Sequence, residues 1–470
     1  MRRTKIVCTI GPASSSPDVL RQLIKAGMNV ARLNFSHGTH EEHRKVIKTI
    51  RTLSDEMGMP VAILQDISGP KIRIGEFKNE NVLLERDSTF TLTNRDVIGD
   101  ELQVSVNYRD LPDDVEVGDT ILLSDGNIEL NVNEKTSTDI NCRVVVGGVL
   151  SSHKGVNLPT VTMGVSVLTP KDKYDLKFGI EQDVDYIALS FVRTARDIED
   201  LKSIIMNEGA NIPVIAKIEK HEALSNIDEI IKIVDGIMVA RGDLGVEIPF
   251  EKVPLMQKML VRKCNAAGIP VITATQMLMS MVNNPRPTRA EVTDIANAVL
   301  DGTDALMLSE ETAVGNYPVE SVSVMSKIAA NTEKSTDFLE IMGKREIPER
   351  ATTPDAISHA ASMTARTLGS AAIITPTSSG STARMIARYR PTQPIIAISS
   401  NLRTIARLSL VWGVVAVAVD KLLDTDDMTE KAREIARKMG LVKSGSTVVI
   451  TAGVPIGVEG TTNLIKVEVF

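Results

Sequence analysis

The sequence contains few cysteines and aromatic residues, no excess of basic residues and no long apolar run. Its three cysteines, Cys8, Cys142 and Cys264, are an odd number without CxxC spacing, which argues against a disulfide framework or a cysteine zinc site and fits a reducing compartment. Aromatic residues make up 3% of the chain and Trp412 is its one tryptophan, so stacking on nucleic acid bases is not expected. The formal net charge of −7 gives no general attraction to nucleic acids or anionic membranes.

Secretion and membrane insertion are not expected either. The first residues, Met1-Arg-Arg-Thr-Lys5, lead directly into a strand-like run without the apolar region of a signal peptide. No uncharged apolar stretch is long enough to cross a bilayer. With 43% hydrophobic and 24% charged residues, the 470-residue chain is predicted to be a soluble cytoplasmic protein of two to four domains.

Short runs rich in valine, isoleucine and alanine alternate with longer segments of helical periodicity, which indicates βαβ units and a parallel sheet. The predicted strands are Lys5–Ile10, Asn29–Leu33, Val61–Leu64, Tyr186–Leu189, Val214–Ile218, Ile237–Ala240, Val271–Ala274 and Ala305–Leu308. Predicted helices between them include Pro17–Ala26, Glu41–Met57 and Arg196–Asn207. Eight such units favour a closed (β/α)8 barrel, the TIM barrel of the α/β class.

An open doubly wound sheet is the structural alternative. That fold would need a glycine-rich phosphate loop after its first strand, and Gly11-Pro12-Ala13-Ser14-Ser15 does not match this fingerprint.

Two parts of the chain depart from the barrel pattern. From about Lys71 to Thr169, short alternating strands separated by turn signals such as Asp125-Gly126 and Gly147-Gly148 predict a small inserted β-barrel, placed to act as a lid over the catalytic face. After about Ile341 a charged linker (residues 343–354) precedes strands and helices that predict a smaller C-terminal α/β domain, with strands at Ala372–Thr375, Ile395–Ile398, Val414–Val419 and Thr447–Thr451. The predicted boundaries are 1–70 and 169–341 for the catalytic barrel, 71–168 for the β lid domain and 342–470 for the C-terminal regulatory domain.

Polar residues follow six of the predicted barrel strands at their carboxyl ends, where the catalytic groups of this fold lie. They are Arg32, Asn34, Ser36 and His37 at strand two, Asp66 at strand three, Lys217 and Glu219 at strand five, Arg241 and Asp243 at strand six, Thr275 and Gln276 at strand seven, and Ser309, Glu310 and Glu311 at strand eight. One such charge is best explained as a buried ion pair, but six strands converging on one rim are not, because unpaired buried charge is costly. The set therefore predicts an active site.

Two carboxylates on neighbouring strands, Glu219 and Asp243, predict a site for Mg²⁺ or Mn²⁺ completed by water and substrate oxygens. Lys217 and Arg32 would supply positive charge to a phosphoryl group in transfer. The alternative without a metal is a simple ion pair between Lys217 and Glu219, which lie two residues apart on one side of a strand.

Seven motifs in order along the chain resemble the pyruvate kinase family. They are Lys5-Ile-Val-Cys-Thr-Ile-Gly-Pro12, Arg32-Leu-Asn-Phe-Ser-His-Gly38, Lys154-Gly-Val-Asn-Leu-Pro159, Lys217-Ile-Glu219, Ala240-Arg-Gly-Asp-Leu-Gly245, Thr273-Ala-Thr-Gln-Met277 and Pro285-Arg-Pro-Thr-Arg-Ala-Glu291. The resemblance covers the whole chain and implies transfer of the phosphoryl group of phosphoenolpyruvate to ADP, giving pyruvate and ATP. It also implies a homotetramer, which nothing in the composition indicates.

The resemblance implies roles for individual residues by motif position. Arg32 clamps the phosphoryl group and Lys217 stabilises it, Glu219 and Asp243 hold Mg²⁺, and Gly242 and Thr275 meet the carboxylate and carbonyl end of the substrate. Thr275, with Ser309 nearby, relays the proton that converts enolate to ketone. The positions that match the nucleotide phosphate site are Asn34, Phe35, Ser36, His37, Arg73 and Lys154.

The sequence departs from potassium-dependent members of the family after the third strand. Asn34, Ser36, Asp66 and the Ile67 carbonyl retain the ligands expected around K⁺, but Lys71 replaces an acid next to that pocket. One hypothesis is that the Lys71 ammonium group takes over the work of K⁺. The alternative is that Lys71 points to solvent and K⁺ binds as usual.

In the C-terminal domain, hydroxyl groups at a predicted helix start (Ala383–Arg390) resemble the family's pocket for phosphorylated allosteric effectors. The candidate residues are Thr377, Ser378, Ser379, Gly380, Ser381 and Thr382, closed by a loop matching Ala452–Thr462 that lacks arginine and lysine. A well-capped helix without a ligand explains the same residues.

Two other classes of function remain open. A Mg²⁺-dependent pyruvate-enolate lyase or aldolase would share the metal and the arginine, but it would not need a lid or an ADP site. A non-catalytic effector-binding protein is disfavoured because Lys217, Glu219, Asp243 and Thr275 are all present.

Overall fold

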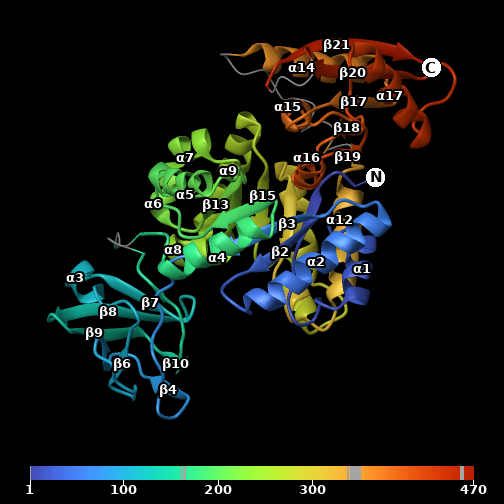
Figure 1. Cartoon of the computed structure of the whole chain (residues 1–470). Helices are drawn as coiled ribbons and strands as arrows, with labels where there is room; N and C mark the ends of the chain where they lie inside the picture. Colours follow the sequence, from blue (N-terminus) through green and yellow to red (C-terminus); the bar gives the residue numbers. More distant parts are fainter. Residues whose placement is uncertain (1, 160, 162–165, 336–337, 339–350, 456–459) are drawn as a thin grey trace.

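The computed structural model describes residues 2–159, 161, 166–335, 338, 351–455 and 460–470. Its centre is a closed barrel of parallel strands (Figure 1). Around the barrel the strands follow the order β1-β16-β15-β14-β13-β12-β3-β2. The strands are β1 (Lys5–Thr9), β2 (Val30–Asn34), β3 (Ala62–Ile67), β12 (Tyr186–Leu189), β13 (Val214–Ile218), β14 (Gly236–Ala240), β15 (Val271–Ala274) and β16 (Ala305–Leu308). The predicted (β/α)8 barrel is confirmed, and the open-sheet alternative is wrong.

Two barrel strands extend further than the sequence predicted. β2 and β3 stay paired up to Asn34 and Asp66, and β3 continues to Ile67. Asp66 therefore lies inside β3 and not after its end. The apolar run of β3 stops at Leu64, but its backbone pairing continues because the buried side chains of Gln65 and Asp66 have partners in α4 (Pro170–Glu181) and β2.

Helices enclose the barrel from outside. They are α1 (Pro17–Ala26), α2 (His40–Met57), α4 (Pro170–Glu181), α5 (Ala195–Asn207), α6 (His221–Ser225), α7 (Ile227–Ile233), α8 (Arg241–Glu247), α9 (Val253–Ala267), α10 (Arg289–Asp301), α11 (Glu310–Ala313) and α12 (Pro318–Thr332). Local chemistry sets their ends. Thr39 and Glu42 form a capping box at the start of α2, and Gly27 ends α1 with a φ of 122° that other residues disfavour.

Alternation along the strands divides the core into two layers. In β1, Val7 points into the barrel interior with Val30 and Leu64, whereas Ile6 and Cys8 point outward against the surrounding helices. Cys8 is thus a buried core residue, as predicted. Cys142 and Cys264 are also buried, and all three cysteines are free. This packing makes the strands a rigid base for the residues at their ends.

The inserted part between β3 and β12 consists of additional β sheets. β4 (Asn81–Leu84) pairs with β10 (Gly148–Ser151). The larger sheet has the order β11-β7-β8-β9-β5-β6, with β5 (Thr89–Thr93), β6 (Gln103–Ser105), β7 (Thr120–Leu123), β8 (Ile128–Lys135), β9 (Asp139–Val146) and β11 (Val156–Asn157), and α3 (Leu111–Asp114) lies between β6 and β7. The predicted Asp125-Gly126 turn joins β7 and β8 with φ values of 57° and 84°. Among the described residues, the larger sheet keeps two edge strands, β11 and β6.

The C-terminal part forms a sheet in the order β19-β18-β17-β20-β21. Its strands are β17 (Ala372–Pro376), β18 (Ile395–Ser399), β19 (Val414–Ala418), β20 (Thr447–Gly453) and β21 (Thr462–Val469), and its helices are α14 (Thr353–Thr367), α15 (Ser381–Ala387), α16 (Leu402–Arg407) and α17 (Thr425–Lys438). β21 was not predicted. Most of the predicted linker lies outside the described residues, and its last residues, Thr353 and Pro354, instead begin α14.

The inserted part and the C-terminal part contact different ends of the barrel (Figure 1). Side chains of the C-terminal part bond to Pro60, Asn211 and Asp304, which precede β3, β13 and β16. The inserted part contacts the carboxyl ends, where Asn157 of β11 reaches Glu247 of α8. Among the described helices, none is both long and apolar enough to cross a membrane. The domain boundaries at residues 70/71, 168/169 and 341/342 stay predictions.

Candidate active site

A continuous chain of ion pairs crosses the carboxyl end of the barrel. Arg32 Nε donates to Asp66 Oδ2 at 2.7 Å, and Lys217 Nζ lies 3.4 Å from Asp66 Oδ1 and 2.8 Å from Glu219 Oε1. The side chains of Asp66 and Glu219 are each 2% exposed, whereas those of Arg32 and Lys217 are 11% and 12% exposed. The two cations therefore keep a narrow opening to the barrel mouth, and the acids that hold them are buried.

The charges of this network support one another. Burial raises the pKa of Asp66, but Lys217 and Arg32 outweigh burial and lower it below its ordinary value. Burial lowers the pKa of Lys217, but Asp66 and Glu219 outweigh it, so Lys217 has a pKa above the ordinary lysine value and is charged. Burial raises the pKa of Glu219, and repulsion from Asp243 adds to this rise. A cation between Glu219 and Asp243 would relieve that repulsion.

The placement of the two acids fits a divalent ion. Glu219 directly follows β13, and Asp243 lies in the first turn of α8, directly after β14, which pairs with β13. Two carboxylates of this kind suit Mg²⁺ or Mn²⁺, which prefer oxygen ligands. Glu219 Oε2 also accepts the Phe191 amide at 2.9 Å, so this carboxylate has a fixed orientation. The Lys217–Glu219 ion pair of the metal-free alternative is present as well.

Thr275 lies beside the Arg241-Gly242-Asp243 segment with an unusual backbone. Its φ is 69° and that of Gln276 is 55°, a left-handed region that β-branched residues rarely adopt. Thr275 Oγ1 accepts the Gly242 amide at 2.8 Å and donates to the Ala274 carbonyl at 2.6 Å. A Cβ added at Gly242 would meet only ordinary contacts with Thr275, so the fold itself does not require glycine there.

Arg241 positions this loop. Its guanidinium donates to the carbonyl oxygens of Ala274 and Thr275 at 3.1 and 2.7 Å, and its Nη1 pairs with Asp294 of α10 at 2.8 Å. These contacts hold the loop in place, so Arg241 orients the site. Its acidic partner is Asp294 and not Glu219 or Asp243, because the side chain turns back along β15 toward α10.

At the end of β16, Glu311 is the residue that organises the loop. Its side chain is buried and accepts the amides of Leu278 and Ser309 at 2.9 and 2.7 Å. Glu310 is exposed. Ser309 therefore has a fixed position between β16 and α11, at the carboxyl end of its barrel strand.

The segment Asn34–His37, predicted to contact nucleotide phosphates, divides into buried and exposed parts. Asn34 Oδ1 accepts the Ser36 amide at 3.1 Å, and Ser36 and His37 are exposed. The Phe35 ring is buried and stacks on His43 with ring centres 4.1 Å apart. The Phe35 backbone also has partners, because its amide donates to the Asp66 carbonyl at 2.9 Å and its carbonyl accepts from Lys171 Nζ at 2.7 Å.

Arg73, Lys154 and Lys71 come from the inserted part and its junction with the barrel. Arg73 Nη1 donates to the His153 carbonyl at 3.0 Å, and Lys154 is exposed. The Lys71 side chain runs beside Gly155, and Lys71 lines a small cavity with Asp243 and other residues. Among the described residues, no hydrogen bond joins Lys71 to Asn34, Ser36 or Asp66.

The predicted effector residues border one cavity of about 260 Å³ between β17, β18 and α17. Thr377, Ser378, Ser379, Ser381 and Thr382 line it, and Gly380, with φ 81°, precedes α15. The helix α15 begins at Ser381 and ends at Ala387, not at Ala383 and Arg390 as predicted. Lys421 also lines the cavity and supplies a cation that the sequence analysis did not consider.

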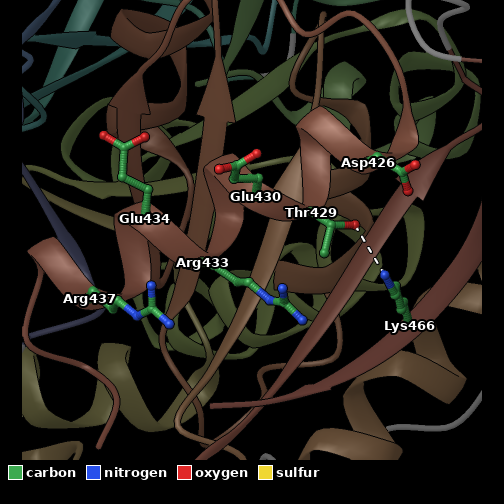
Figure 2. Close-up of a pocket in the computed structure, with 7 residues that line it drawn as sticks. All are labelled: Asp426, Thr429, Glu430, Arg433, Glu434, Arg437 and Lys466. Atoms are coloured by element: carbon green, nitrogen blue, oxygen red, sulfur yellow. Dashed lines mark hydrogen bonds between the residues drawn. The ribbon is translucent and has the colours of Figure 1, made fainter.

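A separate hollow of about 820 Å³ lies over α17 and β21. Figure 2 shows the side chains that line it, which are Asp426, Thr429, Glu430, Arg433, Glu434, Arg437 and Lys466. Its cations already have partners in the same domain. Arg433 and Lys466 both pair with Glu468, and Arg437 lies over the Phe470 ring. None of the predicted effector residues borders this hollow, and we assign no ligand to it.

Sequence reasoning missed two groups in the site. Lys217 Nζ donates to Ser190 Oγ at 2.8 Å, and Arg32 Nη1 donates to Thr9 Oγ1 at 2.9 Å. Ser190 follows β12, and Thr9 ends β1. Both residues could have been found from the sequence, because each is a polar residue at the carboxyl end of a barrel strand.

Arg32, Lys217 and Glu219, which come from the motifs that resemble pyruvate kinase, meet Asp66 at one end of the barrel. Comparison with known proteins points to the same family. Residues 1–322 match the family described as pyruvate kinase, barrel domain, and residues 355–468 match pyruvate kinase, alpha/beta domain. The chain belongs to the pyruvate kinase family.

Relatives of the family match along the full length of the chain. The chain is 52% identical over 471 residues to a pyruvate kinase of Geobacillus stearothermophilus and covers 80% of that protein. It is 51% identical to pyruvate kinase 2 of a Synechocystis species and covers 79% of it. It is 45% identical to a pyruvate kinase of Clostridium acetobutylicum and covers all of that protein. Pyruvate kinases are metal-dependent phosphotransferases that convert phosphoenolpyruvate and ADP to pyruvate and ATP.

Proposed function

We propose that this chain transfers the phosphoryl group of phosphoenolpyruvate to ADP at the carboxyl end of its barrel. The observation that carries the proposal is the network of Arg32, Asp66, Lys217 and Glu219, because it fixes two cations with little solvent around them. Charge that develops on a transferring phosphoryl group is stabilised best by donors that are already oriented and desolvated. Arg32 would clamp that group, and Lys217 would neutralise it during transfer.

Glu219 and Asp243 would hold Mg²⁺ or Mn²⁺. When bound, the ion supplies positive charge that organises the phosphoryl and carboxylate oxygens of the substrate. The Gly242 amide and the Thr275 hydroxyl face each other at 2.8 Å, so a substrate carboxylate entering here would exchange that contact for its own. The P–O bond to the enolate oxygen breaks, a new P–O bond forms to the terminal phosphate of ADP, and the enolate carbon accepts a proton.

Thr275, with Ser309, is the candidate to relay that proton. The Thr275 hydroxyl donates to the Ala274 carbonyl at 2.6 Å and is therefore oriented before substrate arrives. Asn34, Ser36, His37, Arg73 and Lys154 would contact the ADP phosphates. Lys154 and Arg73 belong to the inserted part, so its closure would bring cations over ADP and exclude water, which favours transfer over hydrolysis.

The test is ATP formation from phosphoenolpyruvate and ADP with Mg²⁺. We expect Lys217→Met to lower kcat by about 10²–10³-fold, since an oriented donor at the developing charge is removed. Lys263→Met is the control, because Lys263 is a surface lysine paired with Asp228. The kcat of this variant is expected to stay within about twofold of that of the unmodified protein, since surface charges have small effects. Enolate chemistry without dependence on ADP would favour the lyase or aldolase alternative.

We also propose that Lys71 replaces K⁺. Asn34, Ser36, Asp66 and the Ile67 carbonyl are the residues that would hold K⁺ if it were retained. The proposal is supported by Lys71 lining a small cavity together with Asp243, one of the two acids proposed to hold the metal ion. Activity is expected to persist when K⁺ is exchanged for a large inert cation, and Lys71→Glu is expected to make activity depend on K⁺. Collapse of the unmodified protein's activity without K⁺ would contradict the proposal.

For the C-terminal domain we infer a site for a phosphorylated effector at Thr377–Thr382. Hydroxyls, backbone amides and Lys421 around one cavity suit a phosphate group. Sugar phosphates and AMP should change the cooperativity of the response to phosphoenolpyruvate, and this change should be lost in Lys421→Met. We further infer a cytoplasmic homotetramer, to be checked by light scattering and cell fractionation.

A further inference from the structure

A second group of metal-ligand side chains lies at the junction of α6 and α8. Ligand atoms of His221, Glu222 and Glu247 lie within 4.8 Å of one another, and no other such group of three occurs in the part of the chain that the structure describes. His221 Nδ1, Glu222 Oε2 and Glu247 Oε2 are each shielded from solvent and lack a hydrogen-bond partner. The Glu247 side chain is 1% exposed. Unsatisfied buried carboxylate and imidazole atoms are costly, so three together need an explanation.

The distances between these atoms suit a shared metal ion better than direct hydrogen bonds. His221 Nδ1 lies 3.3 Å from Glu222 Oε2 and 3.6 Å from Glu247 Oε2. Charge-assisted N–H···O bonds are shorter, about 2.7–2.9 Å. Ligands about 2.0–2.2 Å from a tetrahedral zinc ion are separated from each other by about 3.3–3.6 Å. The two distances from His221 Nδ1 therefore match edges of a zinc tetrahedron, and all three ligand atoms lie within 4.8 Å of one another.

The surroundings complete such a site. Glu247 Oε1 is held by Lys220 Nζ at 2.7 Å and by Asn157 Nδ2 at 3.4 Å, which leaves Oε2 for another ligand. Outer contacts of this type orient the carboxylates that bind metals. The His221 side chain is 34% exposed, so the three shielded ligand atoms lie just below the surface, and water would take the fourth position of an ion bound there.

We propose that His221, Glu222 and Glu247 bind a divalent transition-metal ion, with Zn²⁺ the best match to one imidazole and two carboxylates. This ion is distinct from the one proposed at Glu219 and Asp243. The inference goes beyond the proposed function and does not depend on it. The ion joins α6, which begins two residues after Glu219, to α8, which carries Asp243. It therefore braces the two segments that present the active-site acids.

The test counts zinc ions by calorimetric titration of Zn²⁺ into metal-free full-length chain. The background is the double variant Glu219→Gln and Asp243→Asn, which removes the active-site acids. We expect this background to bind one Zn²⁺ per chain and its melting temperature to rise on binding. Adding Glu222→Gln or His221→Ala is expected to weaken binding at least 100-fold, since each removes a direct ligand and loss of an outer contact alone costs about 10–100-fold.

Two outcomes would overturn the proposal. The double variant could bind no Zn²⁺, or its Zn²⁺ binding could be unchanged by His221→Ala and Glu222→Gln. If His221→Ala does not fold, the site can still be tested by adding Co²⁺ to the double variant and measuring its visible absorption. A strong visible absorption, typical of four-coordinate cobalt, supports the site, and the weak absorption of six-coordinate cobalt argues against it.

Discussion

Thr275 shows how much local strain the active site contains. A β-branched residue with φ 69° costs about 1–3 kcal/mol relative to an unstrained conformation. The strain persists because Arg241 donates to the Thr275 carbonyl and Gly242 donates to the Thr275 hydroxyl. Strain of this kind is typical of a residue whose orientation matters more for function than for stability.

Substitutions at Thr275 should separate stability from activity. Thr275→Gly is expected to leave the free energy of unfolding unchanged or to raise it by about 1 kcal/mol, because strain is relieved while glycine adds entropy to the unfolded chain. Its kcat is expected to fall at least about 100-fold, the lower end of the usual effect of a positioned proton relay. Thr275→Ser keeps the hydroxyl and is expected to retain most activity. Urea unfolding and the ATP assay measure both quantities.

A loss of more than about 2 kcal/mol in Thr275→Gly would contradict this explanation, since it would mean that side-chain packing and not strain dominates at the position.

At the scale of single elements, helix ends depend on short-range chemistry that is visible in the sequence. Thr352 and Asp355 form a capping box at the start of α14, where Asp355 Oδ2 accepts the Thr352 amide at 2.8 Å and the Thr352 hydroxyl at 2.7 Å. Arg388, which directly follows α15, pairs with the other carboxylate oxygen of Asp355. One carboxylate thus both starts α14 and fastens it to the segment after α15.

Asp355→Asn is expected to lower the free energy of unfolding by about 1–2 kcal/mol at neutral pH, because the cap weakens and Arg388 loses its partner. Burial raises the pKa of Asp355, but the Thr352 hydrogen bonds and Arg388 outweigh burial and lower it below the ordinary value. Since the folded-state pKa is lowered, the stabilisation is present above about pH 4 and is lost as pH falls through the folded-state pKa.

Thermal unfolding from pH 7 to pH 3 measures this effect. The difference in stability between the unmodified protein and Asp355→Asn should become smaller below pH 4. Asp18→Asn is the control, because Asp18 is an exposed acid in the first turn of α1, and a change within about 0.5 kcal/mol is expected. A constant gap across the pH range would show that charge is not the cause.

At the scale of the whole molecule, the C-terminal part docks on the face of the barrel opposite the active site. The central contact is Arg390, which is 4% exposed and pairs with Asp304 at 2.9 Å just before β16. It also donates to Asn265 and the Gly302 carbonyl and lies over Trp412. The C-terminal part therefore rests on the amino-terminal ends of the barrel strands, away from Glu219 and Asp243.

Arg390→Met is expected to lower the free energy of unfolding by about 3–5 kcal/mol, because Asp304 is left buried without its cation. Two separate thermal transitions are expected as the C-terminal part uncouples from the barrel. Arg403→Met is the matched control, since Arg403 pairs with Asp183 across the same two parts but both side chains are more than half exposed. A change of at most about 1 kcal/mol is expected there. Differential scanning calorimetry measures both variants, and equal effects would contradict the explanation.

The sequence determined the features that depend on neighbouring residues. The apolar runs located every barrel strand to within a few residues, because a buried parallel strand is continuously apolar. The polar residues at the strand ends included the charged groups that the structure brings together at the carboxyl end of the barrel. The helices between them followed from periodicity. β21 was not found because it is an edge strand in which buried and exposed residues are mixed.

Only the tertiary structure decided which distant residues meet. It brought Glu247 to His221 and Glu222, Asp294 to Arg241, Ser190 to Lys217, and Asp304 to Arg390. Such pairs are separated by whole strand–helix units or by domains, and nothing in the local sequence encodes their partners. Strand spacing and alternation are properties of a few adjacent residues, whereas the contacts between side chains at the strand ends depend on barrel closure, which brings residues far apart in the chain to one rim.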